Sequence, residues 1–242
     1  MFGEIKNRHG EKLDYTFHPG SSGSQNLVVL GHGVTGNKDR PFLVALAEAL
    51  SASGRAVLRF SFSGNGTSGG RFVDSNISKE VEDLGSVLDA TTQRQVCYIG
   101  HSMGGAVGVS RASQDSRIRW LISLAGMVHT ADFAQREFGM VSPDHGNMWD
   151  DPNCPLSSTY MNDLKSIGTL VEKGSAIRVP WLLVHGSEDD VVPIQDSKDI
   201  LSRASQASAQ LVTIAGSGHV FSNEHTAKLV DVVKTWLTSH WP

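Results

Sequence analysis

The chain has 242 residues, of which 39% are hydrophobic and 19% charged, and its formal net charge is −4. This balance is typical of a globular protein with one large domain or two small ones. Acidic and basic residues are interspersed, which argues against a basic face for nucleic acid and against a polybasic membrane anchor. Because the sequence contains neither a membrane-spanning apolar run nor the apolar core of a signal peptide, we expect a cytoplasmic protein.

The apolar segments, taken in chain order, alternate between strand-like runs and helical spacing. A hairpin is expected first, over residues 4–17, and a flexible connection follows over 18–24. Further strands are expected as short apolar runs at 27–30, 56–60, 95–99, 118–124, 181–184 and 210–214. Helical spacing recurs between them at 41–54, from about 78, at 106–109, at 195–204 and over 229–237. This alternation predicts an α/β protein with a mostly parallel central sheet and helices on both faces.

The alternation breaks between residues 127 and 179. We therefore expect a core formed by residues 1–126 and 180–242, with residues 127–179 inserted as a small cap over the carboxyl edge of the sheet. Large apolar side chains in this segment are candidates for a substrate pocket and are equally compatible with a small core of the cap itself. The chief candidates are Phe138, Met148, Trp149 and Tyr160.

The segment Gly100-His101-Ser102-Met103-Gly104 has the spacing Gly-x-Ser-x-Gly between an expected strand and an expected helix. A serine on such a sharp strand-to-helix turn holds strained backbone angles, and small flanking residues let the strand and the helix pass close together. The turn exposes the serine hydroxyl and directs backbone N–H groups of the helix start toward a bound oxygen. Ser102 is therefore the predicted nucleophile.

A serine nucleophile needs a general base, and that base needs an anion to orient it. The strand ending near residue 214 leads to His219, which we predict to be the base. His101 is a weaker candidate, because its side chain is expected to point away from the neighbouring hydroxyl. The strand ending near residue 184 leads to three adjacent acids, Glu188, Asp189 and Asp190, and the residues alone do not choose among them.

These features together resemble the α/β-hydrolase superfamily, and within it the small bacterial cinnamoyl/feruloyl-type esterases and the serine aminopeptidase-like hydrolases. The similarity covers nearly the whole chain and rests on residues 32–37, 59–68, 100–105 and 218–222. It implies that the triad acid is Asp189, through the pattern His-Gly-x-x-Asp-x-x-Val-Pro. It also implies an oxyanion hole made by the backbone N–H groups of Val34 and Met103.

The chain departs from the family pattern at several positions around the expected site. Ser61, Ser63 and Asn65 stand where the family has Asp, Arg and His, which is expected to affect the packing of that loop. Val34 and Met103 replace the Phe and Gln of cinnamoyl esterases, so specificity for phenolic esters does not follow from the resemblance.

The predicted activity is hydrolysis of a small-molecule carboxylic ester through an acyl-enzyme, with no metal or organic cofactor. A thioesterase or an aminopeptidase-like hydrolase would use the same triad, and a ligand-binding α/β-hydrolase scaffold is the non-enzymatic alternative. Residues 64–69 fit Gly-x-Gly-x-x-Gly, but no helix follows at once, which disfavours a nucleotide site. The acids Glu80, Glu82 and Asp83 are expected to form a solvated helix face. The sequence does not indicate an oligomeric state.

Overall fold

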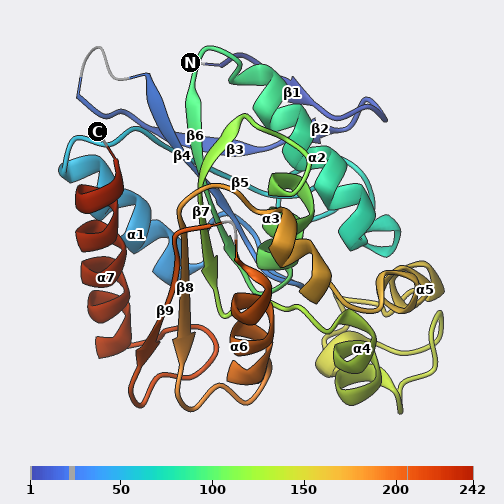
Figure 1. The fold of residues 1–242 in the computed structure, drawn as a ribbon. Helices are drawn as coiled ribbons and strands as arrows, with labels where there is room; N and C mark the ends of the chain where they lie inside the picture. Colours follow the sequence, from blue (N-terminus) through green and yellow to red (C-terminus); the bar gives the residue numbers. More distant parts are fainter. Residues whose placement is uncertain (1, 22–24, 206, 242) are drawn as a thin grey trace.

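A twisted seven-stranded sheet runs through the middle of the described chain (Figure 1). The structure is a computed structural model that describes residues 2–21, 25–205 and 207–241, so residues 22–24 of the predicted flexible connection lie outside the described residues. The strands lie in the order β3 (Tyr15–His18), β5 (Val57–Phe60), β4 (Asn26–Gly31), β6 (Gln95–His101), β7 (Ile118–Leu124), β8 (Trp181–Gly186), β9 (Ala209–Ile214). All neighbouring strands are parallel except β3 and β5. The predicted α/β-hydrolase fold with a mostly parallel sheet is confirmed.

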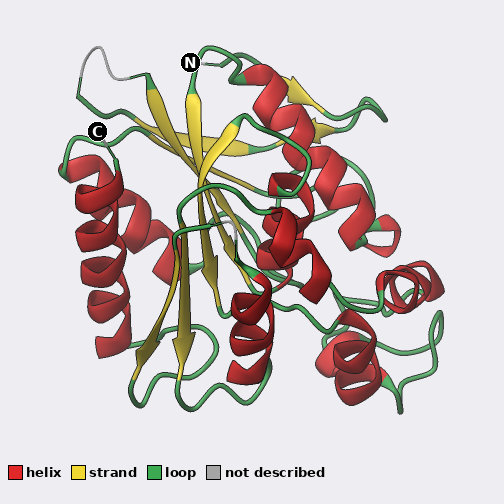
Figure 2. Cartoon of the chain, in the orientation of Figure 1, coloured by secondary structure: helices red, strands yellow, loops and turns green. Residues whose placement is uncertain are grey.

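Helices cover both faces of this sheet (Figure 2). One face packs against α1 (Pro41–Ala52) and α7 (Glu224–His240), and the other against α2 (Ile77–Ala90), α3 (Met103–Ala112) and α6 (Ile194–Arg203). Successive residues of β4 serve the two layers alternately, because Leu27 and Val29 join the layer of α2 and α3 whereas Val28 and Leu30 join that of α1. Burial on both faces explains why this strand has a continuous apolar run.

The N-terminal hairpin is shorter than predicted. β1 (Ile5–Lys6) pairs antiparallel with β2 (Lys12–Leu13), but residues 15–18 leave the hairpin and pair with β5 at the edge of the main sheet. The chain is redirected at Asp14, whose N–H donates to Ser68 Oγ and whose carbonyl accepts from Ser61 N–H. The alternation of residues 12–17 could not reveal this change of partner, since both halves are strands.

The segment 127–179 contains α4 (Thr130–Phe138), η2 (Met148–Asp150), α5 (Ser158–Ile167) and η3 (Val171–Ala176). Helices α4 and α5 pack against each other, and they lie at the end of the molecule toward which the arrows of β8 and β9 point (Figure 1). In a parallel sheet this is the carboxyl edge, where α/β proteins bind ligands. The division into core and cap stays a prediction.

The prediction that the acids of α2 form a solvated face is wrong for Glu80 and Asp83, which are both 0% exposed. Asp83 accepts hydrogen bonds from Ser63 N–H and from the Asn7 side chain, at 2.7 and 2.8 Å. The N-terminal hairpin and the loop after β5 therefore cover part of the polar face of this helix. Only Glu82 approaches the surface, where it pairs with Arg8.

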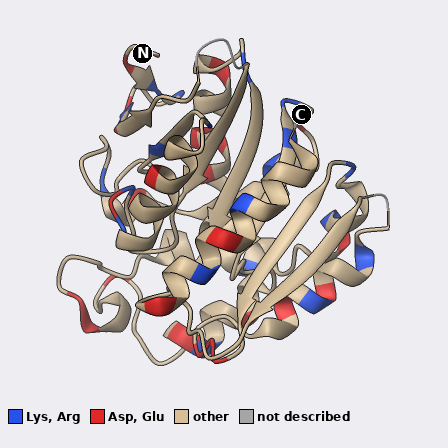
Figure 3. Ribbon diagram, turned by 90° about the vertical axis from the view of Figure 1, so that its left-hand side faces the viewer, with Lys and Arg blue, Asp and Glu red and all other residues tan. Residues whose placement is uncertain are grey.

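Figure 3 marks the positions of Lys and Arg and those of Asp and Glu on the ribbon, and both kinds are distributed over the helices and loops. Over the described residues, no helix is both long enough and apolar enough to cross a bilayer.

Candidate active site

Ser102 stands at the turn between β6 and α3, with φ 54° and ψ −117°. A positive φ costs a serine conformational free energy. The surrounding structure must therefore hold the turn in this conformation. A Cβ atom at Gly100 would lie 2.1 Å from the carbonyl oxygen of Gly104, which shows how closely the strand and the helix approach. The predicted elbow geometry requires this approach, and only glycine permits it at this position.

The loop after β4 lies against Ser102. A Cβ atom at Gly33 would stand 2.9 Å from Ser102 Cβ and 3.4 Å from Ser102 Oγ. The next residue, Val34, donates its backbone N–H to no group in the described protein, and Met103, as the first residue of α3, precedes the first intrahelical hydrogen bond. Neither of the predicted oxyanion donors thus has an acceptor among the described residues.

A buried histidine fixes this loop, a role that the sequence analysis missed. His32 Nε2 accepts a hydrogen bond from Phe62 N–H at 3.0 Å, so its proton is on Nδ1, which donates to Gly33 O at 2.8 Å. Burial lowers the pKa of His32 to about 4, so the ring is neutral near pH 7. The pair His32-Gly33 at the end of β4 is the sequence feature that could have indicated this role.

Asp189 and His219 meet after β8 and β9. Nδ1 of His219 lies 2.9 Å from Asp189 Oδ2, while Asp189 Oδ1 accepts from the N–H groups of Val191 and Val192 at 3.0 and 2.9 Å. Burial opposes ionisation of Asp189, but hydrogen bonds from His185 and His219 outweigh it and hold its pKa well below the usual range. The carboxylate is therefore ionised at neutral pH and fixes the proton of His219 on Nδ1. That tautomer leaves Nε2 as the nitrogen able to accept a proton.

Two further histidines support this pair. Nε2 of His185 lies 3.2 Å from Asp189 Oδ2 and 2.8 Å from Val192 O, and the side chain is 0% exposed. His101 is neutral, because burial holds its pKa well below the usual range, and its Nε2 lies 2.9 Å from His219 O. The rings of His101 and His219 are 4.7 Å apart. His101 thus belongs to the site through its contacts with His219, and the orientation of its side chain away from the Ser102 hydroxyl stays a prediction.

Two cavities adjoin at the loop after β4, and Ser102 lines the larger of them. The larger has a volume of about 270 Å³ and is lined by Gly33, Val34, Thr35, Gly36, Arg40, Phe42, His101, Ser102, Trp149, Val191, His219 and Val220. The smaller has a volume of about 10 Å³, room for about one water molecule, and is lined by Val34, Thr35, Asn65, Phe72, Ser75, Glu80, Met103, Met148, Ser157 and Tyr160. Val34 and Thr35 line both, so the cavities adjoin at the predicted oxyanion loop.

The four predicted pocket residues are distributed unevenly between these cavities. Trp149 lines the larger one, whereas Met148 and Tyr160 line the smaller. Phe138 is fully buried and lines neither of them; its ring packs against Trp149 at 4.9 Å and against Tyr160 at 6.3 Å. Phe138 therefore supports the lining residues from behind.

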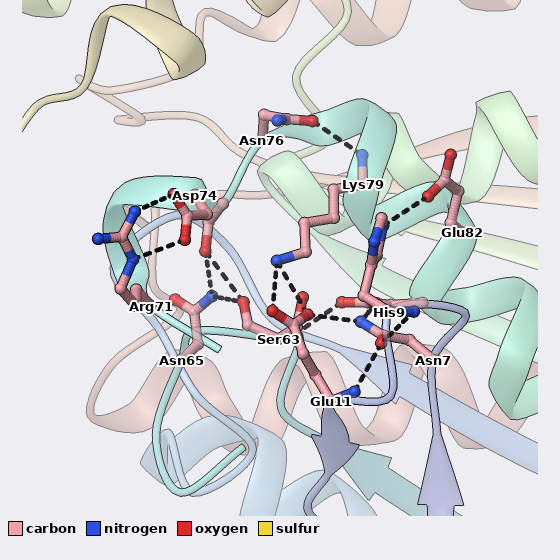
Figure 4. Close-up of polar contacts among 12 residues, drawn as sticks. Asn7, His9, Glu11, Ser63, Asn65, Arg71, Asp74, Asn76, Lys79 and Glu82 are labelled. Atoms are coloured by element: carbon pink, nitrogen blue, oxygen red, sulfur yellow. Dashed lines mark hydrogen bonds and ion pairs between the residues drawn. The ribbon is translucent and has the colours of Figure 1, made fainter. Parts of the chain in front are cut away.

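The loop after β5 forms one wall of the smaller cavity and is tied down by polar contacts (Figure 4). Asn65 Nδ2 donates to Ser63 O at 3.1 Å and to Ser75 Oγ at 3.3 Å. Nearby, Lys79 of α2 lies 2.9 Å from Glu11 of the N-terminal hairpin. The departure from the family pattern at residue 65 is thus accommodated within this network, in which residue 63 takes part through its backbone carbonyl. Within the described residues, no three His, Cys, Asp or Glu side chains gather as a metal site.

Comparison with protein families identifies the class to which this arrangement belongs. A model described as the alpha/beta hydrolase fold matches residues 26–153, more than half of the chain, and one described as serine aminopeptidase S33 matches residues 153–226. The chain therefore belongs to the α/β-hydrolase fold family.

Individual relatives have low sequence identity to this chain, but the similarity extends over most of its length. A monoacylglycerol lipase of Mycolicibacterium smegmatis is 24% identical, covering 96% of this chain and 94% of the lipase. The human mitochondrial palmitoyl-protein thioesterase ABHD10 is 23% identical over 73% of this chain and 61% of its own length. Among solved structures, Est1E from Butyrivibrio proteoclasticus with bound ferulic acid is 25% identical, with a TM-score of 0.85 over 98% of both chains.

Proposed function

We propose that the protein hydrolyses carboxylic esters through an acyl-enzyme formed on Ser102. The observation that carries the proposal is the Asp189–His219 hydrogen bond at the edge of the cavity that Ser102 also lines. An imidazole held by a buried carboxylate is the base that a serine hydroxyl requires. In this proposal residues 127–179 act as a cap that covers the reacting groups.

The reaction proceeds in two halves. Ser102 Oγ attacks the ester carbonyl carbon while its proton passes to His219 Nε2, and the N–H groups of Val34 and Met103 stabilise the oxyanion. The bond to the alcohol then breaks as His219 returns that proton to the alcohol oxygen. Water attacks the acyl-enzyme and gives its proton to the same nitrogen, and Ser102 recovers a proton as the acid leaves. Asp189 stabilises the imidazolium at each stage.

The test compares Ser102→Ala with Ser110→Ala, a matched control at a buried serine of the same helix. We expect Ser102→Ala to lose roughly a thousandfold or more in kcat and to escape labelling by a fluorophosphonate probe, with an unchanged circular dichroism spectrum. Ser110→Ala should retain both properties. Turnover by Ser102→Ala above a tenth of the wild-type rate would reject Ser102 as the nucleophile. Absence of labelling in the folded wild type would favour a non-catalytic binding scaffold.

A thioesterase is the second candidate, favoured by the similarity to the palmitoyl-protein thioesterase. The same serine attack would release a thiol in place of an alcohol. An S-acyl and an O-acyl substrate with one common acyl group, assayed beside a feruloyl ester and an aminoacyl anilide, distinguish the alternatives. An ester hydrolase gives the highest kcat/KM with the O-acyl substrate.

A further inference from the structure

The larger cavity contains a positive charge whose role the proposed reaction leaves open. Arg40 lines this cavity together with Ser102 and His219. Among the described residues of the lining, it has the one side chain that stays charged throughout the physiological pH range. Much of the remaining lining is apolar and consists of Val34, Phe42, Trp149, Val191 and Val220. A fixed positive charge on an otherwise apolar wall favours a substrate that carries negative charge.

The guanidinium group of Arg40 has no acidic partner in the part of the chain that the structure describes. Its one hydrogen bond there runs from Nη2 to the carbonyl oxygen of Thr35, at 3.1 Å. The neighbouring acid Asp39 pairs instead with Lys38, at 2.8 Å, and with Arg59. A guanidinium group carries five N–H donors in one plane, so most of the donors of Arg40 remain for a ligand.

The positive charge of Arg40 acts on the groups around Ser102. The hydrogen bond to Thr35 attaches Arg40 to the loop that contains the predicted oxyanion donor Val34. Helix α1 begins directly after Arg40 with no acid in its first turn and no side-chain cap, so the positive end of its dipole adds to the same charge. Burial lowers the pKa of His101, and the positive charge of Arg40 lowers it further. An anionic group bound in this cavity therefore meets a positive potential.

We infer that the larger cavity binds small esters that carry a carboxylate, and that the guanidinium group of Arg40 binds this carboxylate. The inference rests on the proposed ester hydrolysis and adds the class of substrate. The planar fork of a guanidinium group pairs with both oxygens of a carboxylate. One guanidinium group balances one negative charge, which favours a carboxylate over a doubly charged phosphate. A volume of about 270 Å³ lies near the lower limit for ligand pockets, which favours a small ester.

The test measures kcat/KM for two pairs of esters in which an acetyl group replaces the carboxylate at nearly the same shape. The pair para-acetoxybenzoate and para-acetoxyacetophenone places the charge on the alcohol half, and the pair monoethyl succinate and ethyl levulinate places it on the acyl half. In at least one pair, we expect Arg40→Met to lower kcat/KM for the anionic ester about tenfold and for its neutral partner less than about twofold. Arg40→Lys keeps the charge and should lose less on the anionic ester.

The control Arg178→Met removes an exposed arginine that lines neither cavity and precedes β8, at the opposite edge of the sheet. It should leave all four values unchanged. Equal losses on the charged and neutral esters of both pairs would show that Arg40 only supports the loop through Thr35, and would overturn the inference. Full activity of Arg40→Met on both anionic esters would overturn it as well.

A binding measurement separates this inference from the proposed function. Isothermal titration calorimetry of Ser102→Ala with para-acetoxybenzoate and with monoethyl succinate gives a Kd that does not depend on turnover. Adding Arg40→Met to this variant should raise the Kd of at least one of these anions about tenfold. Binding that depends on Arg40, without turnover by the wild type, would reject the proposed function and support this inference. Turnover by the wild type with equal Kd values in the two variants would overturn this inference and leave the proposed function standing.

Discussion

At residue 102 the backbone adopts φ 54° and ψ −117°, which glycine reaches readily and serine does not. The strain is of the order of 1–3 kcal/mol. We expect Ser102→Gly to melt about 3 °C above Ser102→Ala, because glycine relieves the strain and alanine keeps it. Differential scanning calorimetry of the two inactive variants measures the difference. Equal melting temperatures would mean that the turn holds serine without strain.

His32 makes stability depend on pH. Its pKa is about 4 in the folded protein and about 6.5 when exposed, so between these values the unfolded chain binds more protons. Stability therefore rises with pH from 4 to 6.5, and this histidine contributes about 3 kcal/mol to the rise. Urea unfolding of His32→Gln across this window should show a shallower dependence on pH, while the exposed control His145→Gln should match the wild type. An unchanged slope in His32→Gln would assign the dependence to other groups.

At the scale of elements, the sequence predicted most helices and strands because each carries its own apolar pattern. The strand over 118–124 is found within its predicted bounds, and the helix from Pro41 ends close to Gly54. The burial of Glu80 escaped prediction for a physical reason. Helical spacing places an acid on the polar face of its own helix, but it cannot show that a distant segment will cover that face.

Helix α6 anchors the start of the segment 127–179. Asp196, in the first turn of this helix, accepts hydrogen bonds from the N–H groups of Val128 and His129 at 2.7 and 3.1 Å. Asp196→Ala leaves both donors without an acceptor, so we expect a loss of about 1–3 kcal/mol in the free energy of unfolding. Asp196→Asn retains an acceptor oxygen and should lose less. Denaturant titration measures both variants, and an Asp196→Ala variant as stable as the wild type would show that Asp196 does not anchor the segment 127–179.

At the scale of the whole molecule, three loops far apart in sequence meet because the strands before them are parallel. Ser102 follows β6, Asp189 follows β8 and His219 follows β9, so all three lie at one edge of the sheet. The order of elements was sufficient to predict this edge. The distances between side chains were not predictable, and neither were the supporting roles of His101 and His185, since both depend on how the loops pack against one another.

The same convergence places Trp149, from the segment 127–179, on the larger cavity together with His219 and Val220. Trp149 is 43% exposed, lines this cavity and donates from its Nε1 to Glu137 Oε2 at 3.1 Å. If this cavity receives the alcohol, Trp149→Ala should weaken hydrolysis of esters with bulky aromatic alcohols, because it removes an aromatic contact.

We expect kcat/KM of Trp149→Ala for 1-naphthyl acetate to fall about tenfold, and that for ethyl acetate to change less than about twofold. The control Met140→Ala removes a fully exposed apolar side chain that lines neither cavity and should leave both values unchanged. Equal losses on the two esters would show that Trp149 supports the segment 127–179 as a whole. A selective loss on the naphthyl ester assigns the larger cavity to the alcohol, because the two substrates share one acyl group and differ only in the part that leaves.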